Sequence, residues 1–244
     1  MKETLFSLTL LSLLIGCGGG SSSTTTEKID YADYFPKSDM VKNFIEIQRS
    51  GTNFMDINNT YFTENITVTT ATGVTTITTK DGEVIKDTTV IDEHKINRIK
   101  IVDNEKTTNA MNRQMSKGDT LFVENINSSS EEAIGTITNT GTFKCVLEDT
   151  LLDFQEGDHK YTGDIIKIKC IFDGKKITNI KEELLEYLAD SNGSSVVYDV
   201  SYRYMKKEVG MIATIDNNCI ENKLVNDKKD CIPTEKNYQF YLGN

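Results

Sequence analysis

Phe143-Lys144-Cys145-Val146-Leu147-Glu148 and Ile166-Lys167-Ile168-Lys169-Cys170-Ile171 both repeat with a period of two residues. Every second side chain is apolar or a cysteine, which is the pattern of a β-strand with one buried face. A turn at Gln155-Glu156-Gly157-Asp158 folds the two strands into an antiparallel hairpin. The register then sets Phe143 opposite Phe172, Cys145 opposite Cys170 and Leu147 opposite Ile168. It predicts a cross-strand disulfide at a non-hydrogen-bonded pair, with its sulfurs on the buried face.

Strand signals dominate the chain on both sides of this hairpin. The only two prolines are Pro36 and Pro233, and Asp81-Gly82 between β-branched runs is a good two-residue hairpin turn. The segment 40–48 fits a strand or a short helix, and 107–117 is ambiguous. We expect strands over 60–70, 74–80, 83–92, 95–102, 120–126, 133–138, 195–205, 210–216 and 237–242.

One segment has the pattern of a helix. Asn179 and Glu182 resemble a capping box, an apolar stripe runs from Ile180 to Leu188, and Ser191-Asn192-Gly193 ends it. We expect this helix to cover one end or face of the sheet. The predicted fold is therefore mainly β: a curved antiparallel sheet or meander, as a half-barrel or a sandwich, with one short helix.

The N-terminal region has the features of a targeting signal. The apolar run from Leu5 to Ile15 follows Lys2 and is too short to span a bilayer, which takes about 20 residues. It ends in Leu14-Ile15-Gly16-Cys17, which resembles the lipobox of bacterial envelope lipoproteins. The resemblance implies cleavage between Gly16 and Cys17 and attachment of a diacylglycerol to Cys17. It also implies further acylation, and several acyl chains hold a protein on a membrane almost permanently.

The residues after Cys17 set the expected organisation and location. A Gly, Ser and Thr tract reads as a tether, and Gly18 is not the Asp that retains lipoproteins in the inner membrane in the best-studied sorting system. The resemblance thus points to the outer membrane, on its periplasmic or surface face. We predict a signal peptide over 1–16, a lipidated cysteine and tether over 17–28, and one β-rich domain over 29–244.

The five cysteines divide into one and four. If lipid is attached to Cys17, four cysteines remain. In an oxidising compartment outside the inner membrane, four cysteines are expected to form two disulfides. Three pairings are possible; local geometry favours Cys145 with Cys170 and Cys219 with Cys231. A zinc site built from the four is disfavoured because no CxxC spacing is present.

Charge and motifs disfavour several functions. The net charge of −10 disfavours nucleic acid and direct adsorption on anionic lipid. The two histidines, His94 and His159, fall at predicted exposed turns, and we find no nucleophile elbow, HExxH helix or phosphate loop. Acidic pairs such as Glu131-Glu132 and Glu182-Glu183 lack the pattern of a calcium loop. We predict no enzyme activity, no cofactor and no bound metal.

Two asparagines match the extended acceptor pattern of bacterial N-glycosylation, Asp/Glu-x-Asn-x-Ser/Thr. They are Asn58 and Asn192. Asn192 is the better candidate because it follows the predicted helix in a loop.

Two function classes remain. The first, which we favour from sequence, is a non-catalytic envelope lipoprotein that binds another envelope protein or the cell surface. The alternative is a carrier of an apolar, lipid-like ligand, broadly similar in architecture to the half-barrel lipoprotein carriers of the periplasm; this likeness assigns no site residues. An open sheet around a cavity of roughly several hundred cubic ångströms favours the carrier, and a filled sandwich with an exposed patch favours the interaction module.

Overall fold

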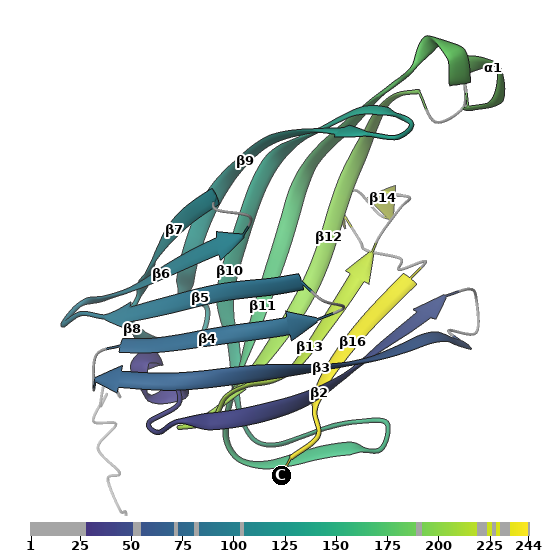
Figure 1. Cartoon of the computed structure of the whole chain (residues 1–244). Coiled ribbons are helices and arrows are strands. Elements are labelled where there is room, and N and C mark those ends of the chain that lie inside the picture. Colours follow the sequence, from purple (N-terminus) through teal and green to yellow (C-terminus); the bar gives the residue numbers. More distant parts are fainter. Residues whose placement is uncertain are drawn as a thin grey trace, which may run out of the picture.

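The computed structural model describes residues 28–50, 55–70, 73–80, 83–102, 105–188, 192–218, 224–225, 228–229 and 235–243. Its centre is one 12-stranded sheet in which all neighbouring strands run antiparallel (Figure 1). Along the sheet the strands are β7 (Glu105–Asn112), β6 (Lys95–Val102), β5 (Glu83–Ile91), β4 (Gly73–Lys80), β3 (Met55–Thr70), β2 (Met40–Ser50), β16 (Glu235–Tyr241), β13 (Gly210–Asn218), β12 (Gly193–Lys206), β11 (His159–Ile180), β10 (Gly135–Glu156) and β9 (Thr120–Glu132).

The sheet consists of two meanders joined by the last strand of the chain. β16 pairs with β2 on one side and β13 on the other, so residues almost 200 positions apart lie side by side. The two edge strands, β7 and β9, also approach each other. There the Asn112 side chain donates to the Thr120 carbonyl at 3.0 Å, and Asn109 donates to Glu124 at 3.3 Å. The result is a nearly closed, curved sheet, as the sequence predicts in its half-barrel form.

The hairpin prediction is confirmed residue by residue. β10 and β11 turn at Gly157 and Asp158, and Cys145 lies directly opposite Cys170 in a disulfide. The flanking pairs are as predicted, Phe143 with Phe172 and Leu147 with Ile168. Both cysteines are fully buried on the inner face of the sheet. The alternating pattern therefore predicts the register of the hairpin correctly.

Among the described residues, the predicted helix is shorter than its expected span and lies away from the sheet that we expect it to cover. Asn179 and Ile180 belong to β11, and only a 3-10 turn, η2 (Glu182–Leu184), and one turn of helix, α1 (Leu185–Leu188), follow. Lys181 caps the turn without a side-chain hydrogen bond, so the capping box does not form. Figure 1 shows α1 at the far tip of the β11–β12 connection, away from the body of the sheet. The β-ladder of β11 with β10 outcompetes the local helical signal.

Apolar side chains collect on both faces of the sheet. The inner cluster combines the disulfide with Leu147, Ile166 and Ile168 and with a short N-terminal 3-10 helix, η1 (Tyr31–Tyr34). The outer cluster lies under the β10–β11 hairpin tip, where Phe154 stacks on Tyr204 at 3.7 Å between ring centroids. The tip thus buries the outer face of β12, β13 and β16 and leaves the inner face free to form a site.

Two further pairs of short strands complete the described structure. They are β1 (Ile29–Asp30) with β8 (Gln114–Met115), and β14 (Leu224–Val225) with β15 (Lys228–Lys229). No helix among the described residues has the length and apolar character needed to cross a membrane.

Candidate ligand-binding cavity

The inner face of the sheet surrounds a cavity of about 370 Å³. This volume falls at the lower end of the range of ligand sites, about 300–1,000 Å³. Its apolar wall includes Ile66, Val74, Ile85, Met111, Leu121, Phe122, Ile168, Met205 and Met211. Six charged side chains also line it: Lys42, Glu64, Asp87, Arg98, Arg203 and Asp216. The cavity is therefore amphiphilic rather than purely apolar.

Lys42 is the most deeply buried of these charges. Its residue is 0% exposed, and its Nζ donates to the Met211 carbonyl. The rings of Phe44 and Tyr241 lie 5.3 and 5.0 Å from Nζ, within the range of cation–π contacts. In the sheet register Lys42 stands opposite Glu64. Burial lowers the pKa of Lys42 to about 8, although the Glu64 carboxylate opposes this shift.

A second group of charges lies on β5 and β6. Arg98 pairs with Asp87 through both Nε, at 2.8 Å, and Nη2. The other carboxylate oxygen of Asp87, Oδ1, is buried and has no hydrogen-bond partner within the described structure. Burial raises the pKa of nearby Glu64, while Lys42 and Arg98 pull it down. This wall offers one unoccupied acceptor beside a fixed ion pair.

The opposite wall carries Arg203 on β12 and Asp216 on β13. Burial raises the pKa of Asp216, against the positive charge of Arg203 and a hydrogen bond from Ser201. Burial lowers the pKa of Arg203, and the positive charge of Arg98 lowers it further. Arg98 on β6 and Arg203 on β12 are far apart in the sequence. Their positive charges nevertheless repel each other across the cavity.

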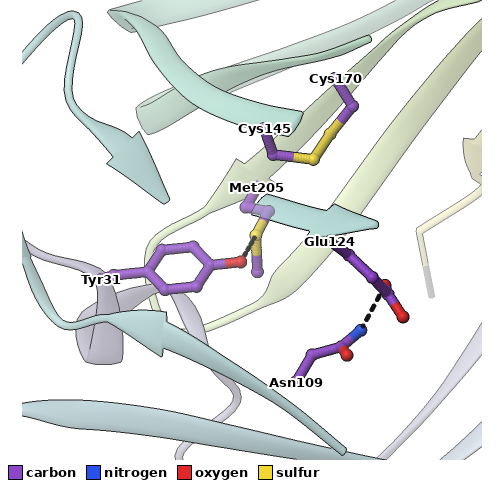
Figure 2. Close-up of a disulfide and its surroundings, with 6 residues drawn as sticks. All are labelled: Tyr31, Asn109, Glu124, Cys145, Cys170 and Met205. Atoms are coloured by element: carbon purple, nitrogen blue, oxygen red, sulfur yellow. Dashed lines mark hydrogen bonds between the residues drawn. A yellow bond between two sulfur atoms is a disulfide. The ribbon is translucent and has the colours of Figure 1, made fainter. Parts of the chain in front are cut away.

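The N-terminal segment packs into this interior. Figure 2 shows Tyr31 of η1 pointing toward Met205, to whose sulfur its hydroxyl donates at 3.2 Å, with the Cys145–Cys170 disulfide nearby. Tyr31 is 5% exposed and lines the cavity together with Phe35 and Pro36. The close approach needs Gly210, which has φ of 84°; a Cβ there would lie 3.2 Å from Pro36 Cδ.

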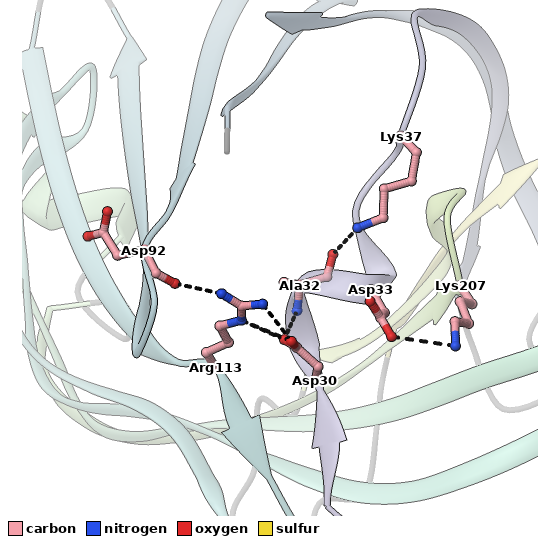
Figure 3. Close-up of polar contacts among 7 residues, drawn as sticks. All are labelled: Asp30, Ala32, Asp33, Lys37, Asp92, Arg113 and Lys207. Carbon is pink, nitrogen blue, oxygen red and sulfur yellow. Dashed lines mark hydrogen bonds and ion pairs between the residues drawn. The ribbon is translucent and has the colours of Figure 1, made fainter. Parts of the chain in front are cut away.

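A polar clasp fixes the same segment to the sheet (Figure 3). Arg113 binds both carboxylate oxygens of Asp30 at 2.7–2.9 Å and donates to the Asp92 carbonyl at 3.0 Å. On the other side of η1, Lys207 lies 3.4 Å from Asp33. The clasp holds the start of the domain, and with it Tyr31, in place at the cavity.

The structure places the sequence-predicted site residues at separate points. Cys145 contributes to the cavity wall. Gly16, Cys17, Cys219 and Cys231 lie outside the described residues, as does the Asp81-Gly82 turn. Lipidation, signal-peptide cleavage and the second disulfide therefore stay predictions.

The two histidines lie at or next to turns between strands. His94 is exposed in the β5–β6 turn, as predicted. His159 is partly buried instead, because its ring stacks on Phe240 with the centroids 4.1 Å apart. Burial lowers the pKa of His159, although Asp158 opposes the shift.

Both candidate glycosylation residues are exposed. Asn58 lies in β3, and Asn192 lies in the bend before β12. There Asn192 Oδ1 accepts a hydrogen bond from the Ile180 backbone at 3.0 Å.

The sequence reading missed the charged lining of the cavity. Lys42, Phe44 and Glu46 alternate inward on β2, but Ile45 and Ile47 between them pack in the outer cluster. With apolar residues on both faces, the pattern of β2 gave no sign of which face is the interior. The signal that could have found the charged lining is the presence of two charged residues, Lys42 and Glu46, on the same face of β2.

A comparison with protein-family models, with curated proteins and with solved structures finds no match to this chain. The cavity is therefore the feature from which a function can be inferred.

Proposed function

We propose that the protein is a non-catalytic envelope lipoprotein that carries a small ligand inside its curved sheet. The observation that carries this proposal is the cavity of about 370 Å³, which combines an apolar wall with six charged side chains. Placing a buried Lys42 and five half-buried charged side chains around one space costs free energy, and charges gathered in a cavity are candidates for binding a ligand. In this proposal, lipid attached to Cys17 of the lipobox-like motif anchors the protein to a membrane, which we infer to be the outer membrane.

The interaction module expected from the sequence has less support in the described part of the chain. Exposed apolar side chains such as Val41 on β2 and Ile77 on β4 are separated in the register by Asn65. A docking surface for a protein is a continuous patch of several hundred square ångströms. We therefore prefer the carrier, and a partly polar ligand to a purely lipid-like one.

Filling the cavity tests carriage directly. Thr78 lines the cavity, whereas Thr79 is the next residue of β4 and is exposed on the other face. We expect the soluble domain, 29–244, to bind the neutral fluorophore N-phenyl-1-naphthylamine at one site. Thr78→Phe should weaken that binding at least tenfold, because the added ring occupies the space. Thr79→Phe is the matched control and should bind as the wild type does; equal binding by all three proteins would refute carriage in this cavity.

Native mass spectrometry of the anchored protein from its own envelope separates the two function classes. A retained small molecule supports the carrier, and a stoichiometric co-purifying protein supports the interaction module. Growth with globomycin, which blocks lipoprotein signal peptidase, should accumulate the unprocessed chain. Normal processing under globomycin would contradict the assignment of Cys17.

A further inference from the structure

One cation of the cavity has no fixed partner. No hydrogen bond or ion pair joins the Arg203 guanidinium to any residue that the structure describes; the ring of Phe143 lies 5.9 Å from its Cζ. Asp216, the acidic residue on the neighbouring strand, hydrogen-bonds with Ser201. A guanidinium has five donors and is expensive to bury without an acceptor. Arg203 is therefore a vacant binding group on the cavity wall.

A second guanidinium, that of Arg98, lies on the facing wall of the cavity. Arg98 interacts electrostatically with both Arg203 and the Tyr31 hydroxyl. Its Nε and Nη2 are hydrogen-bonded to Asp87, whereas Arg203 interacts with the carboxylates of Asp216 and Asp87 only through space. A ligand anion placed against Arg203 would relieve the repulsion between the two arginines. The buried Oδ1 of Asp87, which has no partner in the described structure, can accept a hydrogen bond from an N–H or O–H group elsewhere on the same ligand.

The remaining wall suits an apolar body. Ile66, Val74 and Ile85 on β3 to β5 face the same space as Met111 and Leu121 on the edge strands. Apolar lining with a few placed polar groups is the usual composition of a site that orients a small molecule.

We propose that the ligand is an amphiphile with one anionic head group, a carboxylate, phosphate or sulfonate, which Arg203 binds while the apolar wall holds its body. The proposal rests on the carrier function above and specifies the ligand. Arginine suits this task because its planar fork matches these oxyanions with two parallel hydrogen bonds.

Two fluorophores that differ only in charge test the head group. N-phenyl-1-naphthylamine is neutral, and 1-anilinonaphthalene-8-sulfonate adds one sulfonate to the same rings. We expect the wild-type domain to bind the sulfonate at least tenfold more tightly. Arg203→Gln should weaken binding of the sulfonate roughly tenfold or more and leave binding of the neutral probe within twofold. Lys144→Gln removes one positive charge from the exposed outer side of β10 and should change neither affinity.

The outcomes separate the two proposals. If the wild type binds neither probe, carriage fails and the head-group assignment fails with it. If it binds both equally, or if Arg203→Gln leaves the affinity ratio unchanged, the head-group assignment fails while carriage stands. Should Arg203→Gln lose the neutral probe as well, Arg203→Lys decides: an intermediate preference for the sulfonate supports the anion site, and no preference refutes it.

Discussion

Lys42 shows how a single residue can be held in the interior against its own desolvation. Its ammonium has three donors, of which the Met211 carbonyl takes one, and two aromatic rings lie close to Nζ. Burial lowers its pKa from 10.5 to about 8. The folded state therefore binds this proton less tightly than the unfolded chain does, and the charged form of Lys42 costs stability.

The sign of this shift predicts an unusual pH dependence. Between pH 8 and 10.5 the unfolded chain holds the Lys42 proton and the folded protein does not, so stability rises with pH over that window. Lys42→Met removes the group. As the pH rises from 7 to 10.5, the unfolding free energy of the wild type should increase by roughly 3 kcal/mol relative to that of this variant.

Urea unfolding of both proteins across that range measures the difference. The exposed Lys144→Met variant is the control and should follow the wild type at every pH. Parallel curves for the wild type and Lys42→Met would show that Lys42 titrates normally in the folded state.

At this scale the sequence could not identify the site. The residue types of Lys42, Arg98 and Arg203 do not distinguish an inward charge from a solvated one. Each faces the cavity because the sheet closes, and closure depends on pairing between β2 and β16, at opposite ends of the chain. Local periodicity cannot report such a contact.

Among the elements, the β10–β11 hairpin was the most predictable. Two strands close in sequence, a glycine turn and two cysteines left one register in which the apolar residues share a face. The helix after Ile180 was the least predictable, because its capping signal is worth only about 1 kcal/mol. Continued pairing of β11 with β10 and β12 through Thr178 satisfies several backbone groups at once and prevails.

The same hairpin contains a pair of facing glycines. Gly141 lies opposite Gly174, and a Cβ on Gly174 would lie 2.3 Å from the Thr140 carbonyl oxygen and 2.9 Å from Gly141 Cα. The neighbouring Phe172 ring occupies the space that the missing side chains leave. The close approach of the two backbones therefore depends on glycine at both positions.

Gly174→Ala should destabilise the domain by about 3 kcal/mol, since backbone atoms must move to admit one methyl group. Gly157→Ala, in the turn, is the control. It meets no atom within 4 Å and has φ of 57°, so it should cost only about 1 kcal/mol. Denaturant midpoints compare the two; an equal loss would mean that β10 and β11 can separate at the glycines without strain.

For the whole molecule, the clasp links the N-terminal segment of the described structure to the cavity. Burial alone would raise the pKa of Asp30, but hydrogen bonds from Arg113 and from the Ala32 backbone outweigh it and hold the pKa below 3.8. A carboxyl with a lowered folded pKa contributes its stability above the unfolded value and loses it as pH falls through the folded one. The clasp is therefore fully formed near neutral pH.

Arg113→Gln should loosen the N-terminal segment without unfolding the sheet. The variant loses the paired hydrogen bonds to Asp30. Tyr31 is then held by packing, by its hydroxyl bond to Met205 and by the backbone hydrogen bond that its N–H donates to the carbonyl of residue 113 at 2.8 Å. We expect amides 29–37 to exchange hydrogen faster at pH 7, and the neutral fluorophore to dissociate faster, because Tyr31, Phe35 and Pro36 line the cavity. Lys117→Gln removes the Lys117–Asp149 ion pair, which involves no residue of the segment, and should change neither rate. If Arg113→Gln frees the segment but leaves probe dissociation unchanged, η1 shapes the cavity wall without governing how long a ligand stays.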